Sequence, residues 1–204
     1  MRYEEFTIEG RNAVIEAYRA GRPIDKLFIL DGCQDGPILT IKREAKAKQT
    51  PVKFVTKERL DQLSETGKHQ GVIAYAAAYE YATVEEILDN ARQKGEAPFL
   101  FLLDNIEDPH NLGAIIRTAN LAGAHGVIVP KNRAAGLTAV VAKTSAGALN
   151  FTPVARVTNL AKTIEELKKE GIWFVCADMG GTTMYDLNLK GPIGRVARKE
   201  GEGG

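Results

Sequence analysis

The feature that most constrains the fold is the apolar run FLFLL at residues 99–103, which is followed by a stretch with helical periodicity. A strand buried on both faces shows no alternation of polar and apolar residues, so this run is typical of an interior strand in a parallel sheet. Similar runs at residues 126–130, 154–157 and 172–177 alternate with helical stretches, and we expect the last run to be buried as well. The alternation predicts a doubly wound α/β domain with a parallel sheet over residues 99–204.

Residues 1–78 show the same alternation on a smaller scale and predict a small α/β unit with a mostly parallel or mixed sheet. Residues 79–98 hold an acidic amphipathic helix and a polar break, so we expect them to be a linker between the small domain and the domain at residues 99–204. The expected strands of the small unit cover residues 26–30, 52–55 and 70–76. The expected helices of the whole chain cover residues 13–18, 38–49, 57–63, 84–94, 112–122, 143–149 and 160–170. Thr56 is the expected N-cap of the helix at residues 57–63.

Composition narrows the class of protein but does not name a partner. The chain is 44% hydrophobic and 26% charged, with a formal net charge of +1, so an RNA-binding surface must come from local placement of Lys and Arg.

Cys33 and Cys176 lack metal-ligand spacing, and we expect two buried reduced thiols and no metal site. No apolar run reaches the ~18 residues that span a bilayer, and residues 1–10 lack a signal-peptide core, which predicts no membrane association and a cytoplasmic location.

The most informative segment is DNIEDPHNLGAIIRTA at residues 104–119, directly after the first apolar run. Open α/β sheets bind ligands at the carboxyl ends of their strands, and this segment starts there. On a helix that begins near Asn111, Gly113 and Arg117 share a face, so the glycine would let a ligand or a second strand approach while the arginine offers donors to phosphate and ribose. His110 flanks this arrangement. The same residues taken alone also fit a helix cap and a surface charge.

The segment at residues 104–129, DNIEDPHNLGAIIRTANLAGAHGVIV, resembles the first signature of the SpoU (TrmH) branch of knotted RNA methyltransferases. The Asn-x-Gly-x-x-x-Arg frame of that signature falls on the Asn, Gly and Arg named above. EGRNAV at residues 9–14 and HQGVIA at residues 69–74 resemble the two ends of the small substrate-binding domain of the family. The resemblance therefore covers nearly the whole chain.

The resemblance implies a SPOUT-type α/β-knot domain that transfers a methyl group from S-adenosylmethionine to a ribose 2′-hydroxyl of structured RNA. Because simpler tRNA enzymes often lack the small domain, 23S rRNA is the favoured substrate, with a tRNA ribose methyltransferase as the alternative. The complete protein is expected to be a homodimer that needs no metal. The residues expected to act in catalysis are Arg117, Asn111 and Glu200.

The resemblance also assigns residues to the methyl donor and to RNA. A glycine-rich turn after a strand is weak evidence alone, and small residues at 143–148 also fit close packing of helices. The residues expected to contact the donor are Ala177, Asp178, Met179, Gly180, Gly201 and Gly203, and those expected to contact RNA are Arg11, Asn12, His110, Ser145 and Asn150.

The last residues depart from the second signature of the family, an apolar strand that leads into Gly-x-Glu-Gly-x-Gly. Glu200, Gly201 and Gly203 match it, but the first glycine falls on Arg198 and a strand position falls on Arg195. An arginine in place of that glycine would fill space that the donor needs, and an arginine in a central strand would bury a charge or expose the strand.

The third signature, which builds the knot and the dimer, has no counterpart, so we expect the knot segment to be missing and an apolar face to lie open. Two explanations stay open: a truncated or altered sequence, or a non-catalytic RNA-binding relative with a damaged donor site. A nucleotide-binding α/β protein of another kind is a more distant interpretation, because the chain holds no P-loop or GxGxxG motif.

Overall fold

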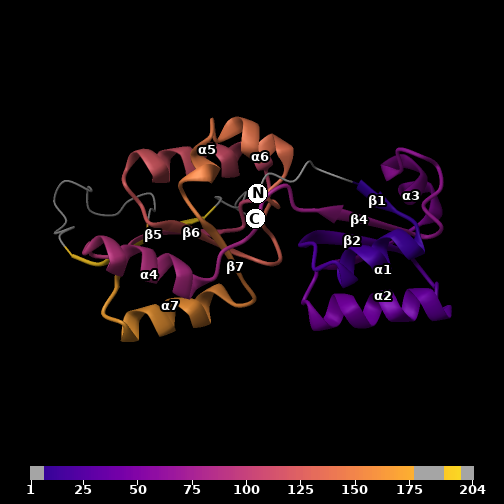
Figure 1. The fold of residues 1–204 in the computed structure, drawn as a ribbon, viewed down its shortest axis with the longest axis horizontal. Helices are drawn as coiled ribbons and strands as arrows, with labels where there is room; N and C mark the ends of the chain where they lie inside the picture. Colours follow the sequence, from indigo (N-terminus) through magenta and orange to yellow (C-terminus); the bar gives the residue numbers. More distant parts are fainter. Residues whose placement is uncertain (1–6, 177–190, 199–204) are drawn as a thin grey trace, which may run out of the picture. The chain divides into compact units, whose positions relative to one another are not determined.

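The computed structural model describes residues 7–176 and 191–198, and the chain divides into two compact units (Figure 1). The first unit is Met1–Glu80 with Gly136–Ala139, and the second is Tyr81–Ala135 with Val140–Gly204. The described elements are β1 (Thr7–Glu9), α1 (Arg11–Arg19), β2 (Ile24–Leu30), α2 (Gly36–Ala47), β3 (Val52–Val55), α3 (Lys57–Leu63), β4 (Val72–Ala76), α4 (Val84–Lys94), β5 (Phe99–Asp104), α5 (Pro109–Leu121), β6 (Gly126–Pro130), α6 (Ala139–Thr144), the 3-10 helix η1 (Ala148–Asn150), β7 (Val154–Val157), α7 (Leu160–Lys169), β8 (Trp173–Cys176) and β9 (Ile193–Arg198).

The first unit is built on a four-stranded mixed sheet with the order β1-β4-β2-β3. β2 and β3 are parallel, whereas β4 pairs antiparallel with both β1 and β2. Apolar side chains of α1 and α2 form a core with one face of the sheet, and Leu60 of α3 packs with Phe28 and Ile73 on the other face. The small α/β unit with a mixed sheet is confirmed, and so is the helix over Lys57–Leu63, whose first turn donates a backbone N–H to the Thr56 side chain.

One segment of the first unit comes from far along the sequence. The Ala78 N–H donates to the Leu137 carbonyl at 2.8 Å, and Leu137 is buried. Gly136 lies so close to the side chain of Asp25 that a Cβ at position 136 would be 2.5 Å from the Asp25 Cγ. The lack of a side chain at position 136 therefore lets the Gly136–Ala139 segment pack closely within this unit.

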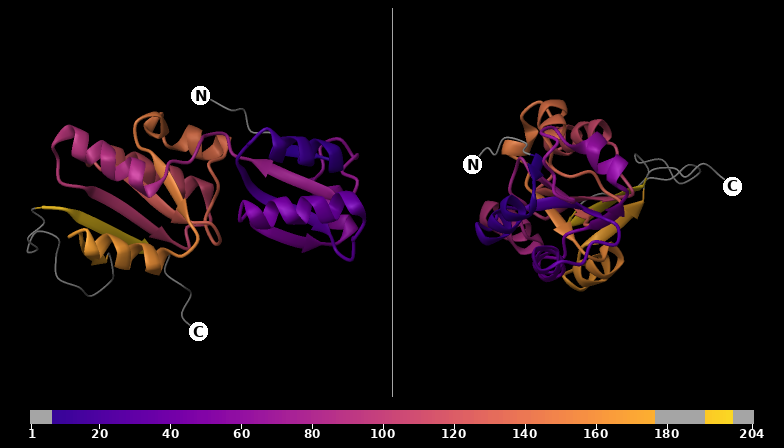
Figure 2. Two further views of the ribbon diagram at one scale, coloured as in Figure 1. Left: turned by 60° about the horizontal axis from the view of Figure 1, so that its bottom comes forward. Right: turned by 90° about the vertical axis from the view of Figure 1, so that its right-hand side faces the viewer.

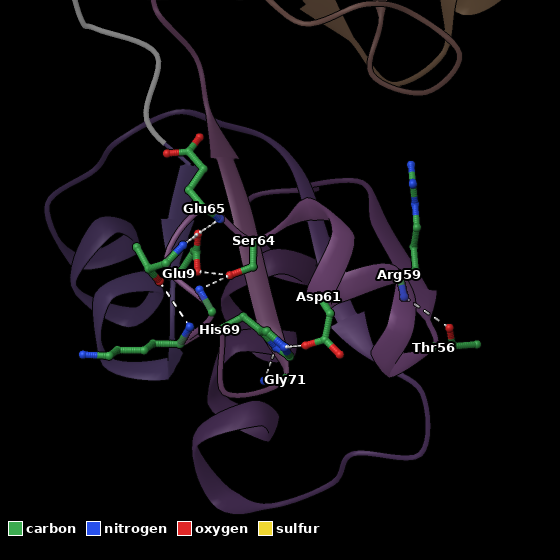
Figure 3. Close-up of polar contacts among 11 residues, drawn as sticks. Glu9, Thr56, Arg59, Asp61, Ser64, Glu65, His69 and Gly71 are labelled. Carbon is green, nitrogen blue, oxygen red and sulfur yellow. Dashed lines mark hydrogen bonds and ion pairs between the residues drawn. The ribbon is translucent and has the colours of Figure 1, made fainter.

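A carboxylate holds the loop after α3 onto the start of this unit, as Figure 3 shows. Glu9 accepts hydrogen bonds from the Ser64 hydroxyl at 2.5 Å, the Glu65 N–H at 2.6 Å, and the Thr66 hydroxyl at 2.6 Å and N–H at 3.2 Å. Partial burial raises the pKa of Glu9, but these donors to its charged form outweigh burial and lower the pKa from 4.5 to about 2.

The second unit is built on a five-stranded sheet with the order β7-β6-β5-β9-β8, in which every pair is parallel. Side chains of α4 and α7, including Ile87 and Leu167, pack against Leu100, Leu102 and Ile128 on one face. Figure 1 shows α5 on the other side of this sheet, and Figure 2 shows the same layers from two further directions. The doubly wound parallel sheet is therefore confirmed.

α4 belongs to this second unit rather than lying between the units, because Ile87 and Ala91 are fully buried. A capping box between Thr83 and Glu86 fixes its start, and Gly95, with a φ of 67°, fixes its end. The division at residues 78 and 99 stays a prediction, and the helix expected in the linker segment is packed into the second unit.

Three expectations about local structure are wrong. β8 is the last strand in the described sheet order and is not an interior strand, so Trp173 is 78% exposed. The thiols are not both buried, because Cys176 at the end of β8 is exposed and Cys33 is half-buried. The helix expected at residues 143–149 is interrupted, since Ala146 and Gly147 have φ angles of 51° and 88° that no right-handed helix accepts.

The hydrogen bonds to Glu9 predict a pH-dependent contribution to stability. Because the carboxyl has a lower pKa in the folded chain than its usual 4.5, its contribution is fully present above pH 4.5 and is lost as the pH falls toward about 2. Glu9→Gln should therefore lower the free energy of unfolding at pH 7, measured by urea denaturation, and the difference from the parent should shrink between pH 5 and pH 3. Glu16→Gln removes an exposed carboxylate of α1 and is the control, with little expected change. An equal difference at pH 7 and pH 3 would contradict this account.

Candidate functional site

The candidate site lies where the strand order of the second unit reverses. β5 pairs with β6 on one edge and with β9 on the other, and such a switch point is where open parallel sheets bind ligands at the carboxyl ends of their strands. At that end Asp104 pairs in register with Arg198, and Asn105 adopts a φ of 60°, which is uncommon outside glycine. The chain therefore turns sharply as it leaves β5, and the Ala135 N–H holds the loop by donating to the Ile106 carbonyl at 2.8 Å.

α5 follows this loop and orients the residues of the motif. Asp108 caps the helix by accepting a hydrogen bond from the His110 N–H at 3.0 Å, and Pro109 occupies the first turn, where a missing N–H has no cost. Leu112 and Ile116 are fully buried against the unit, so the helix is fixed in rotation.

The polar residues of α5 lie on its exposed surface. His110, Asn111 and Arg117 are all exposed, in agreement with a role in contacting a ligand. Within the described residues, the Arg117 guanidinium forms no hydrogen bond or ion pair. Its charge is therefore available to an anionic ligand, although no protein group in that part of the chain holds it in one direction.

Gly113 serves a different purpose from the one expected. The space next to it is occupied by Thr144 of α6, and a Cβ at position 113 would overlap the Thr144 hydroxyl and lie 2.8 Å from its Cβ. That hydroxyl donates to the Val140 carbonyl at 2.8 Å, so the threonine is held in place. The expectation that a ligand or a second strand approaches the backbone at Gly113 is wrong. The glycine instead permits close packing of α5 and α6.

The turn after α6 contains two of the residues expected to contact RNA. Ser145 is fully buried, and its hydroxyl donates to the Ala142 carbonyl at 2.9 Å. This hydrogen bond is a structural role, and burial leaves no atom of the side chain exposed to RNA. Asn150 is exposed, and its amide donates to the Gly147 carbonyl at 3.1 Å. The geometry thus gives no support to RNA binding by Ser145, whereas RNA binding by Asn150 stays a prediction.

Lys131 is a basic group at this edge of the sheet that sequence reasoning missed. It directly follows β6, and partial burial together with the nearby Arg156 cation lowers its pKa. Arg156 of β7 lies 4.4 Å from the centroid of the Tyr81 ring. The sequence signal for Lys131 is its position immediately after an interior parallel strand, because the carboxyl ends of parallel strands lie at the edge of the sheet where ligands bind.

In the first unit, Arg11 is engaged with protein groups. Its Nε donates to the Gln70 carbonyl at 3.0 Å and its Nη2 lies 2.7 Å from the Asp35 carboxylate. These contacts tie the start of α1 to the loops before β4 and α2. Asn12, the next residue, is exposed. RNA binding by Arg11 stays a prediction, and it would have to coexist with this structural role.

The residues expected to contact the methyl donor, together with Glu200, lie outside the described residues; they are Ala177, Asp178, Met179, Gly180, Glu200, Gly201 and Gly203. Of the two arginines that depart from the family pattern, Arg195 is described in full. It is half-exposed in β9, and its guanidinium carbon lies 5.8 Å from the centroid of the Phe101 ring. Arg195 is thus only partly buried.

In the part of the chain that the structure describes, no three His, Cys, Asp or Glu side chains gather in a way that could hold a metal ion. Over the same residues, every helix is too short or too polar to cross a bilayer.

Comparison with known proteins decides the family. The model of the SpoU rRNA Methylase family matches residues 98–203, and the model described as RNA 2′-O ribose methyltransferase substrate binding matches residues 7–82. The chain belongs to the SpoU (TrmH) family of RNA methyltransferases. It is 45% identical to the TrmH family tRNA/rRNA methyltransferase YacO of Bacillus subtilis over 95% of this chain and 78% of that one. A TrmH family tRNA/rRNA methyltransferase of Staphylococcus epidermidis is 44% identical over 98% and 80%.

Solved structures agree on the fold of this SpoU-family chain. The SpoU methyltransferase AviRb from Streptomyces viridochromogenes, crystallised with the cofactor AdoMet, matches 97% of this chain and 74% of its own with a TM-score of 0.52. A second structure of AviRb matches with a TM-score of 0.51. The identities are 20% and 22%, so these matches concern the fold.

The contact at Gly113 predicts a large effect of a single methyl group. Gly113→Ala should lower the free energy of unfolding by about 1–3 kcal/mol in urea denaturation, because the methyl group forces α5 away from α6. Adding Thr144→Ala removes the overlapping hydroxyl and should restore part of the loss. Gly36→Ala is the matched control, since a Cβ there meets no atom within 4 Å and should be tolerated. Equal stability of Gly113→Ala and the parent would refute the packing role.

Proposed function

We propose that this SpoU-family chain transfers a methyl group from S-adenosylmethionine to a ribose 2′-hydroxyl in structured RNA, with 23S rRNA as the favoured substrate. The observation that carries the proposal is the exposed Arg117 guanidinium, which has no ion-pair partner among the described residues and sits on α5, the helix that follows the switch-point strand β5. The 2′-O ribose description of the matching substrate-binding model and the AdoMet bound to AviRb support the acceptor and the donor. A homodimer of the complete protein and a cytoplasmic location belong to the same proposal.

In this proposal Arg117 acts electrostatically on the acceptor. A guanidinium stays charged in proteins, so it is a poor proton acceptor, but it stabilises negative charge that develops on the ribose oxygen and fixes a neighbouring phosphate. Asn111, exposed in the first turns of the same helix, would help to orient the ribose. Glu200 is proposed as a further polar group of the site.

The proposed donor site uses the carboxyl ends of β8 and β9. These strands are parallel neighbours, and Cys176 at the end of β8 pairs with Val196 of β9. The carboxyl ends of β8 and β9 therefore lie at the same edge of the sheet as that of β5, and the expected donor residues follow β8 and β9 in the sequence, which supports a common ligand for both groups. A bound donor supplies an electrophilic methyl group, and the protein has only to align it with the acceptor oxygen.

A tRNA substrate is the alternative within the enzyme class, and the names of the relatives include both RNAs. A second function, RNA binding without catalysis, is favoured by Arg198. This residue stands at the end of β9, directly beside Asp104 at the switch point, where the family pattern has a glycine. An arginine at that point would compete with the donor for space.

Binding of the donor separates the two functions. Isothermal titration with S-adenosylmethionine should give saturable heat if the chain is an enzyme. The absence of heat at high micromolar donor, together with retained binding of 23S rRNA, would establish the non-catalytic function and refute the enzyme.

Arg117→Ala should abolish methyl transfer, measured as tritium from labelled S-adenosylmethionine incorporated into unmodified 23S rRNA and into unmodified tRNA. The reason is loss of the cation at the acceptor, and because Arg117 is exposed the melting temperature should not change. Arg92→Ala removes an exposed arginine of α4 in the same unit and should leave the rate unchanged. Normal turnover by Arg117→Ala would rule out its role.

A further inference from the structure

Charge in the first unit is unevenly distributed along the chain. Residues 36–59, which form α2, β3 and the start of α3, contain seven basic residues against two acidic ones, Glu44 and Glu58. The rest of residues 1–80 contains six basic and ten acidic residues. The net charge of +1 for the chain therefore hides a strongly basic segment, whose basic residues are Lys42, Arg43, Lys46, Lys48, Lys53, Lys57 and Arg59.

Most of these cations are exposed, and none forms an ion pair with the acidic residues that the structure describes. All of them except Lys42, which is half-buried, are exposed. Within the described residues none of the seven forms a salt bridge, whereas Arg11 pairs with Asp35 and Arg19 pairs with Glu16. Exposed cations without acidic partners give a positive potential at the surface, which attracts polyanions.

An exposed aromatic ring lies within this basic segment. Phe54 is 55% exposed on β3, the edge strand of the sheet. The Lys42 ammonium lies 5.1 Å from the centroid of its ring and is held there by donating to the Cys33 carbonyl at 2.9 Å. Lys53, the neighbour of Phe54 on the strand, is also exposed. The edge thus combines a ring, a fixed cation against the ring, and further cations on both sides along the chain.

Protection against aggregation accounts for only part of this arrangement. A lysine on an edge strand prevents pairing with another chain, so Lys53 alone would need no ligand. Phe54 has the opposite effect, because an exposed apolar side chain on an edge strand favours association. Proteins that bind single-stranded nucleic acid combine aromatic rings, on which bases stack, with cations along the backbone of the ligand.

We propose that the β3 surface, defined as Phe54 and Lys53 of the edge strand with Lys42 and the exposed basic residues of α2, binds unpaired nucleotides of RNA. One base stacks on Phe54, and the cations contact the flanking phosphates. The inference rests on the proposed function only in that RNA is the ligand, and it adds a recognition surface distinct from the motif on α5.

The test is RNA binding by the full chain without methyl donor, measured by fluorescence anisotropy with labelled oligo(U) of 20 nucleotides and with a 20-base-pair RNA duplex. The single strand should bind more tightly than the duplex. Phe54→Ala should weaken binding of the single strand about 5- to 150-fold, since stacking contributes roughly 1–3 kcal/mol per base. Phe54→Leu should bind the single strand as weakly as Phe54→Ala does, because an aliphatic side chain offers no π face to a base. Lys53→Gln should reduce the salt dependence, d log K/d log [salt], by about 0.7.

Two control variants make the outcome specific. Leu39→Ala removes another exposed apolar side chain of the same unit and should change the affinity less than twofold. Arg19→Gln removes an exposed cation outside the basic segment and should leave the salt dependence unchanged. An equal loss in Leu39→Ala would indicate that RNA binding depends on exposed apolar side chains in general, and would overturn base stacking on Phe54. Unchanged binding by Phe54→Ala, or no binding of oligo(U) by the parent at low salt, would also overturn the proposal.

Because no donor is present, the result does not depend on methyl transfer. A parent chain that methylates RNA while Phe54→Ala binds normally would refute only the β3 surface. A parent chain that fails to methylate but loses RNA binding on Phe54→Ala would refute only the catalytic proposal.

Discussion

The second unit depends on the pairing of β5 along both of its edges. β6 and β9 take up its backbone groups, and Leu100, Leu102 and Leu103 are fully buried. Each such side chain contributes about 1.5–3 kcal/mol through removal of apolar surface from water, so the strand cannot shift without loss of the core. Because both edges and both faces of β5 are occupied, its carboxyl end is the part of the strand that stays available to a ligand, and Asn105, with its positive φ, and the motif loop lie there.

The chemistry of the site follows from packing that has no chemical role of its own. Leu112 and Ile116 face the core, and that rotation of α5 places His110, Asn111 and Arg117 outward. Thr144 fills the space beside Gly113, so contact between two helices holds α5, which carries the arginine; among the described residues no polar group pairs with the arginine side chain. A site of this kind offers an exposed cation whose direction a bound ligand can set.

Elements with a strong pattern could be predicted from the sequence, and those set by tertiary context could not. The apolar runs of β5, β6 and β7 and the capped helices α3 and α4 have signals that lie within a few residues. β8 has the same kind of apolar run, but its place at an edge depends on which strands pair, which is not a local property.

The same distinction holds for the residues of the candidate site. The position of Arg117 on an exposed helix that follows an interior strand could be predicted, because the apolar run and the helical periodicity are local signals. The occupant of the space at Gly113 could not, since it comes from α6 some thirty residues later. The buried state of Ser145 and the paired state of Arg11 likewise depend on neighbours that sequence spacing does not reveal.

The small unit is not one continuous stretch of chain, and this limits how it can be exchanged. Gly136–Ala139 packs with residues of the first eighty, through the Leu137 carbonyl and the close approach of Gly136 to Asp25. A recombination event that transfers only residues 1–80 between relatives would pair one parent's Asp25 with the other parent's loop. The first unit of this chain can therefore be exchanged intact only when two separate segments of the gene are transferred together, or when the loop already fits its new neighbour.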